Sequence, residues 1–132
     1  MKKRIDALTR LGKLQARMHD LGRWRLSAIA REQASLGDDL RAVFEALESG
    51  DLAYGSQAKL GARRVRGLQK KIDSLARESV EVHERAKAHG ISAKLAEQAA
   101  ETAARRYRDE KERKELADLI ERAVARRAAS PT

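Results

Sequence analysis

The stretch VRGLQKKIDSLARESVEV, residues 65–82, carries apolar side chains at alternating steps of three and four residues. These residues are Val65, Leu68, Ile72, Leu75 and Val82, with Ser79 in the one polar slot. This is the a/d spacing of a coiled-coil seam, and a seam of this kind needs a partner helix to cover it.

An upstream run with the same spacing supplies a candidate partner for residues 65–82. The run consists of Leu26, Ile29, Leu36, Leu40, Val43 and Leu47, with Gln33 as its odd member. Between the two runs lies a Gly/Ser cluster at Ser49, Gly50, Gly55 and Ser56. We therefore expect an all-α fold, an elongated antiparallel two-helix coiled-coil hairpin.

The pairing register of such a hairpin follows from the residue numbers. Residues that face each other in an antiparallel pair keep a nearly constant sum, and matching the a and d steps permits sums near 108 or 115. The sum of 108 centres the turn near residue 54, within the Gly/Ser cluster. We prefer this register, in which Leu36 faces Ile72 and Val43 faces Val65.

The expected boundaries make residues 1–127 a single helical hairpin. The first arm covers about 3–48, the tip about 49–56 and the second arm about 57–127, followed by a frayed tail at 128–132. Gly50 is the expected C-terminal cap of the first arm, and Ser56 is the expected N-cap of the second. Gly90 predicts a kink or a break in the second arm, with Ser92 as the cap of a third helix in the second case.

The first arm also carries a more N-terminal apolar stripe. Its members are Leu8, Leu11, Leu14, Met18 and Leu21. To join this stripe to Leu26, the seam must slip by one residue around Gly22, which predicts a local change in coiled-coil winding.

The second arm is longer than the first, so its end should have no helix to pack on. Residue 1 would lie opposite residue 107 or 114, yet Leu116, Leu119 or Ile120, Ala123 and Arg127 still form a stripe. An exposed apolar stripe favours helix-in-groove binding to another protein. Dimerisation or bundle formation by the hairpin itself is the alternative.

The composition limits the classes of protein to consider. Charged residues make up 37% and aromatic residues 3% of the 132-residue chain, which leaves little apolar mass for a compact core. Cysteine is absent, so disulfides and thiolate metal sites are excluded. No apolar run is long enough for a signal peptide or a membrane span, so we expect a cytoplasmic location.

The charge is uneven along the chain. Residues 1–31 carry a net charge of +7 and residues 32–54 a net charge of -5, within a total of +9. A basic N-terminal arm can favour nucleic acid, anionic lipid or an acidic protein surface, or it can simply be a solvated helix face.

Residues that would carry catalysis or cofactor binding are not arranged for it. His83 and His89 are six residues apart and point to different faces of a helix, and the glycines match no nucleotide-binding fingerprint. We expect no catalytic, cofactor-binding or metal-binding residues, no cofactor and no small-molecule substrate. Trp24 is either a binding anchor or a seam residue at the expected slip.

Two segments resemble a known family. They are the opening Arg4-Ile5-Asp6-Ala7-Leu8-Thr9-Arg10-Leu11 and the charge-dense Arg105-Arg106-Tyr107-Arg108-Asp109-Glu110-Lys111-Glu112-Arg113-Lys114-Glu115-Leu116-Ala117-Asp118. In a small, basic, cysteine-free helical hairpin, these segments resemble the FliJ/YscO stalk proteins of flagellar and type III secretion export. Gly90 departs from the family, whose second helix usually reads as continuous.

The resemblance implies a non-enzymatic, cytoplasmic component that sits at the hexameric export ATPase as a central stalk. It also implies that the hairpin body contacts the export gate or chaperones. The implied ATPase-facing surface comprises Lys2 to Leu11 and Leu116 to Arg127. Its expected partner-binding residues are Lys2, Lys3, Arg4, Leu8, Leu11, Leu116, Leu119, Ile120, Ala123 and Arg127.

A second hypothesis belongs to a different class of protein. The arginines of residues 1–31 and 63–71 are compatible with a nucleic-acid-binding or nucleoid-associated coiled coil, whose affinity would fall steeply as salt rises. A self-assembling structural coiled coil is the third hypothesis.

Overall fold

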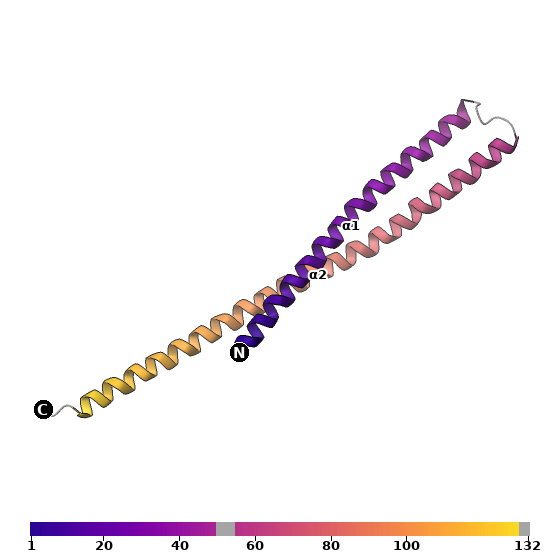
Figure 1. Ribbon diagram of the computed structural model, residues 1–132. Helices are drawn as coiled ribbons and strands as arrows, with labels where there is room; N and C mark the ends of the chain where they lie inside the picture. Colours follow the sequence, from indigo (N-terminus) through magenta and orange to yellow (C-terminus); the bar gives the residue numbers. More distant parts are fainter. Residues whose placement is uncertain (50–54, 130–132) are drawn as a thin grey trace. The chain divides into compact units, whose positions relative to one another are not determined.

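The computed structural model describes residues 1–49 and 55–129, and this part of the chain is an all-α helical hairpin (Figure 1). Helix α1 is Lys2–Glu48 and helix α2 is Gly55–Ala129. The helices contribute to two compact units. The first, here called the tip unit, comprises residues 17–90, and the second, the terminal unit, comprises the described residues of 1–16 and 91–132.

The observed helix ends lie close to the predicted ones, with two corrections. Helix α2 begins at Gly55, so Ser56 lies inside the helix and the prediction that it is the N-cap is wrong. Ala128 and Ala129 continue α2, so the helix extends two residues beyond the predicted end of the second arm at 127, and the predicted fraying stays a prediction. The cap predicted at Gly50 lies outside the described residues, and the single-domain boundary of 1–127 stays a prediction.

The register of the tip unit is set by a close approach of the two helices at Gly22. A Cβ built on Gly22 would lie 2.7 Å from the Cβ of Ala86 and 3.4 Å from its Cα. The two residue numbers sum to 108, so the preferred register is confirmed. Glycine is needed at this position because any side chain would collide with the facing helix.

The predicted seam residues do form the core of the tip unit. Ile29, with 1% of its surface exposed, Val43, Leu68 and Leu75 are buried. Leu26, Leu36, Leu40 and Leu47 of α1 and Val65, Ile72 and Val82 of α2 are half-buried on the same a/d spacing. Burial of this stripe is the main stabilising contribution available to a two-helix structure.

The N-terminal stripe of α1 was wrongly predicted beyond Leu8, and so was the slip at Gly22. In the tip unit, Met18 and Leu21 are exposed, whereas His19 and Gly22 are half-buried. In the terminal unit, Leu11 and Leu14 are exposed, whereas Ile5, Leu8 and Gly12 are half-buried.

The physical reason is that the seam keeps its three-and-four spacing by using small or polar residues where the helices come close. The steps run through Gly12, Gln15, His19 and Gly22 to Leu26, and no residue is skipped. Large apolar side chains at these positions would prevent the approach that Gly22 permits.

Gly90 does not break the second helix, because α2 is continuous through it. The predicted third helix with Ser92 as its cap is therefore wrong. A Cβ on Gly90 would lie 3.0 Å from Nδ1 of His19, so the glycine leaves room for the imidazole ring. His19 Nδ1 donates a hydrogen bond to the carbonyl oxygen of Ala86 at 2.7 Å, since a carbonyl can only accept.

Charged residues of opposite sign face each other along one edge of the tip unit. Nε of Arg25 donates to Oε1 of Glu78 at 2.8 Å, and Nη1 of Arg25 lies 3.5 Å from Oε1 of Glu32. The pKa of Arg25 is raised above its usual value, mainly by the hydrogen bond to Glu78. Towards the tip, Glu32 and Lys71 line one groove and Asp39 and Arg64 line another. The acidic end of α1 is thus matched by basic residues of α2.

The terminal unit has the same register with a thinner seam. A Cβ on Gly12 would lie 3.5 Å from the Cβ of Ala96, and these numbers also sum to 108. The α2 side of this seam consists of Ala93, Ala96, Ala100 and Ala103 and ends at the half-buried Tyr107. Small side chains bury little area, so this seam is held less strongly than that of the tip unit.

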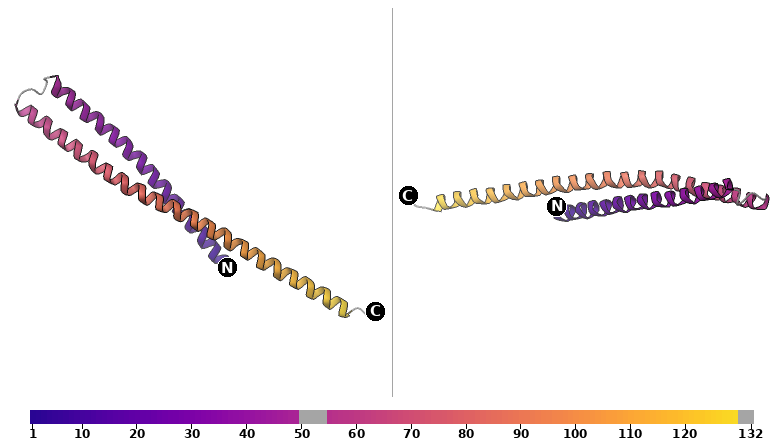
Figure 2. Two further views of the ribbon diagram at one scale, coloured as in Figure 1. Left: turned by 180° about the vertical axis from the view of Figure 1, so that it is seen from behind. Right: turned by 90° about the horizontal axis from the view of Figure 1, so that it is seen from above.

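Beyond Tyr107, helix α2 continues past the N-terminus of α1, as both views in Figure 2 show. Every residue from 108 to 129 is exposed. Opposite charges at i and i+4, such as Asp109 with Arg113 and Glu110 with Lys114, favour an isolated helix in this segment. We call residues 108–129 the overhang.

The close approach at Gly22 yields a stability prediction. Gly22→Ala should lower the free energy of unfolding by about 1–3 kcal/mol through overpacking, although alanine is the better helix former. Thermal and denaturant unfolding followed by circular dichroism measures the change.

Gly67→Ala is the matched control, because nothing lies within 4 Å of a Cβ at Gly67. It should raise the free energy of unfolding by up to about 1 kcal/mol. Adding Ala86→Gly to Gly22→Ala should remove the collision and restore part of the lost stability. A double variant that is less stable than Gly22→Ala by about 1 kcal/mol, the full cost of a second glycine in a helix, would contradict this account.

Candidate protein-binding surface

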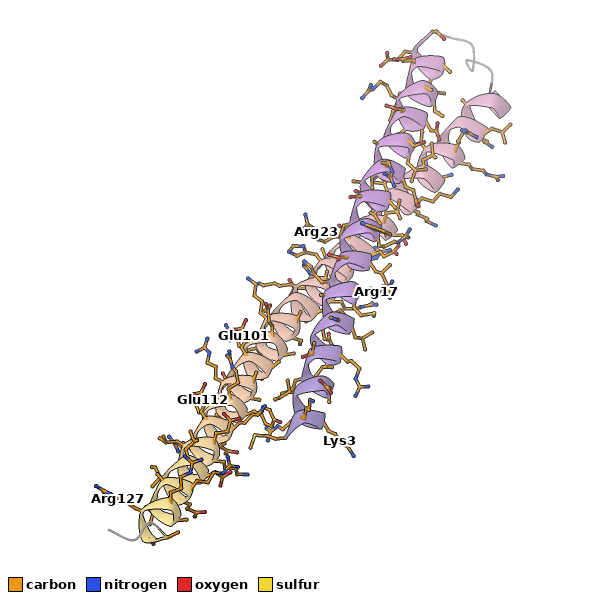
Figure 3. The ribbon with its side chains drawn as sticks, turned by 60° about the vertical axis from the view of Figure 1, so that its left-hand side comes forward. Lys3, Arg17, Arg23, Glu101, Glu112 and Arg127 are labelled. Carbon is orange, nitrogen blue, oxygen red and sulfur yellow. The ribbon has the colours of Figure 1, made fainter. Side chains whose placement is uncertain are left out.

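The predicted partner-binding residues all lie in the terminal unit and nearly all are exposed. On α1, Lys2, Lys3, Arg4 and Leu11 are exposed, whereas Leu8 is half-buried in the seam. On α2, Leu116, Leu119, Ile120, Ala123 and Arg127 are exposed along the overhang. Figure 3 places Lys3 at the start of α1 and Arg127 near the end of α2.

The structure does not bring the two predicted segments together into one surface. Met1 and Arg4 share a shallow groove with Thr102, Ala103 and Arg106 of α2. Leu116 lies ten residues beyond Arg106, which is about 15 Å further along the helix. Lys2 to Leu11 and Leu116 to Arg127 are therefore successive surfaces along the terminal unit.

The apolar residues of the overhang do not continue the seam. Extending the seam spacing beyond Tyr107 leads to Glu110, Lys114, Ala117 and Glu121, which are mostly charged. Leu116, Ile120 and Ala123 lie on another side of the helix, since successive residues are about 100° apart. The overhang is thus not a seam that has lost its α1 partner but a surface with a different orientation.

Two exposed apolar residues nearer the middle of α2 were missed by the sequence reasoning. Ile91 is 52% exposed and Leu95 is 61% exposed, while their neighbours Ala93 and Ala96 face α1. Steps of three and four lead from Leu95 to Leu116 and Leu119, which are also exposed. Extending the spacing test to every face of α2, rather than to the seam alone, would have found this stripe.

The tip unit carries its own exposed aromatic residue. Trp24 is 72% exposed on the outer side of α1, so the interpretation that it packs in the seam is wrong. Arg23 beside it is exposed as well, although successive side chains point about 100° apart around a helix, so the two residues lie on different faces of α1. Exposed tryptophan is typical of protein-binding surfaces, where its large ring buries much area.

Neither a metal-binding cluster nor a membrane-spanning helix is present among the described residues. Among residues 1–49 and 55–129, no three His, Cys, Asp or Glu side chains come together in a way that could hold a metal ion. No helix in this part of the chain has the length and apolarity to cross a membrane. Grooves lie along the junction of α1 and α2, and another is lined by Asp109, Glu112, Arg113 and Leu116 of α2 alone.

Comparisons with known proteins give no relative for this chain. No family model matches it, and neither the curated proteins nor the solved structures yield a match.

The exposure of Trp24 predicts a fluorescence result. Trp24 is the single tryptophan of the chain, so its emission reports on this one site. We expect an emission maximum close to that of free tryptophan in water and ready quenching by acrylamide. A blue-shifted, poorly quenched emission in the wild-type chain would contradict the exposed placement.

Proposed function

We propose that the protein is a non-enzymatic adaptor of flagellar or type III protein export that binds the hexameric export ATPase through its terminal unit. The observation that carries the proposal is the exposed stripe of Leu116, Leu119 and Ile120 on a part of α2 where every residue is exposed. A stripe of this kind gains free energy when another protein covers it. The resemblance to the FliJ/YscO stalk proteins supplies the identity of that partner.

The proposed mechanism uses the hairpin as a stalk. The overhang and the basic residues Lys2, Lys3 and Arg4 contact ring subunits of the ATPase, while the tip unit contacts the export gate or chaperones. Bracing of the ring then couples ATP hydrolysis to substrate unfolding or gate opening. The proposed location is the cytoplasm, where such an ATPase works.

The nucleic-acid hypothesis receives less support from the charge arrangement. Arg64 and Lys71 belong to the basic run of α2, and each shares a groove with an acidic residue of α1. Carboxylates beside these cations reduce the positive potential that would attract phosphates. Protein binding therefore remains the better-supported proposal.

The test of the export hypothesis is binding to the hexameric ATPase. The wild-type chain should co-purify with the ATPase and stimulate its hydrolysis rate. The double variant Leu116→Asp/Ile120→Asp should lose both effects, because two carboxylates would have to be buried on binding.

Val80→Asp is the matched control, since Val80 is 66% exposed on α2 but belongs to the tip unit. It should bind and stimulate as the wild type does. Absence of stimulation by the wild type, or equal binding by the double variant, would count against the proposal.

A further inference from the structure

The outer side of α2 in the terminal unit carries one continuous row of exposed residues on strict a/d spacing, here called the outer stripe. Its members are Ile91, Leu95, Gln98, Thr102, Arg105, Asp109, Glu112, Leu116, Leu119 and Ala123. It is apolar at both ends and polar or charged in the middle. The α1-facing alanines lie on another side of the helix, and every residue of the outer stripe is exposed. Three of its members, Leu95, Gln98 and Thr102, also line the groove beside the N-terminus of α1.

We propose that the outer stripe is a self-association surface, on which α2 of a second copy of this chain pairs antiparallel in a two-fold symmetric dimer. In such an interface each contact occurs twice, because residue i meets residue j and j meets i. When the outer stripes of the two copies are aligned so that facing residue numbers sum to 214, leucine meets leucine and opposite charges meet. Leu95 then faces Leu119, and Ile91 faces Ala123.

The charges in the middle of the outer stripe favour a second copy over an unrelated partner. At the sum of 214, Arg105 faces Asp109, which places opposite charges together on both sides of the two-fold axis. A partner of uniform charge would leave one of these two residues facing a like charge. The charged centre of the stripe is therefore complementary to itself, whereas the layers beside it pair Gln98 with Leu116 and Thr102 with Glu112.

One edge of the paired helices repeats this self-complementarity. In the hairpin itself, the edge pair Arg25 and Glu78 sums to 103, which is five less than the seam sum of 108. The same offset in the dimer gives edge pairs that sum to 209. These are Lys94 with Glu115 and Glu101 with Arg108, both of opposite sign.

The other edge meets the groove beside the N-terminus of α1. There Ile120 falls opposite Ala99 at a sum of 219, and Ala99 shares its groove with Leu8 and Leu95. The side chain of Ile120, 55% exposed in the single chain, thus gains an apolar site. Arg106 and Arg113 are the one like-charge pair of this edge.

The contact is long enough for a stable dimer. Pairing from Ile91 to Ala123 extends over about 50 Å of helix on each copy. A specific interface buries about 800 Å² per partner, and helix pairing over several heptads is a common way to reach it. The dimer and the proposed ATPase contact both use Leu116, Leu119 and Ile120, so the two assemblies exclude each other, but neither depends on the other.

Cysteine cross-linking tests the register directly, because the chain has no cysteine of its own. Leu95 and Leu119 are 24 residues apart on one helix, about 36 Å, so a disulfide between them can form only between chains. The double variant Leu95→Cys/Leu119→Cys should give a covalent dimer in mild oxidant. Each single variant should stay largely monomeric on a denaturing gel.

Glu97→Cys/Glu121→Cys is the matched control, with the same separation on another side of α2. It should cross-link far less than Leu95→Cys/Leu119→Cys. Equal cross-linking by the control, or efficient cross-linking by Leu95→Cys alone, would overturn the antiparallel register. A wild-type chain that sediments as a monomer at about 100 µM would overturn the dimer itself, while leaving ATPase binding open to its own test.

Charge reversal provides a second measurement on the same dimer. Glu101→Arg and Arg108→Glu should each weaken self-association by about tenfold, since each creates two like-charge pairs. The combined variant should return close to the wild-type dissociation constant in sedimentation. If the combined variant is as weak as the single ones, Glu101 and Arg108 do not face each other.

Discussion

The close approach of the two helices at Gly22 and Ala86 is the constraint on which the tip unit depends. Two helices alone cannot enclose a deep core, so each must bring its backbone near the other wherever side chains allow it. At Gly22 the separation leaves no space for even one methyl group. His19 then reaches the Ala86 carbonyl, and Gly90 is required because the imidazole occupies the space beside it.

The sequence was sufficient to predict the all-α hairpin, the register and the seam from Leu26 to Val82. Large apolar residues with a strict spacing determine these features, and their burial dominates the free energy. The sequence was insufficient to predict the exposure of Leu11, Leu14, Met18 and Leu21, because large apolar side chains were assumed to be buried. Where helices touch backbone to backbone, the inward positions belong to glycine and alanine, and the larger residues lie outside.

The same difficulty explains what was predicted and what was missed at the candidate surface. Leu116, Leu119 and Ile120 were found because they lie beyond the reach of α1. Ile91 and Leu95 were overlooked because alanines of the seam surround them in the sequence. Helix α2 has two distinct sides here, one that packs on α1 and one that remains exposed, and only exposure in the structure separates them.

The overhang also has a consequence for the energetics of any binding event. Its amide hydrogen bonds lie beside exposed side chains only, so local opening of this helix costs less free energy than opening of the seam of the tip unit. Binding of a partner to the overhang orders this helix, and the free energy of the new contacts must offset the conformational entropy that is lost. Ordering of the overhang therefore offsets part of the contact energy of any partner, a second copy of the chain included.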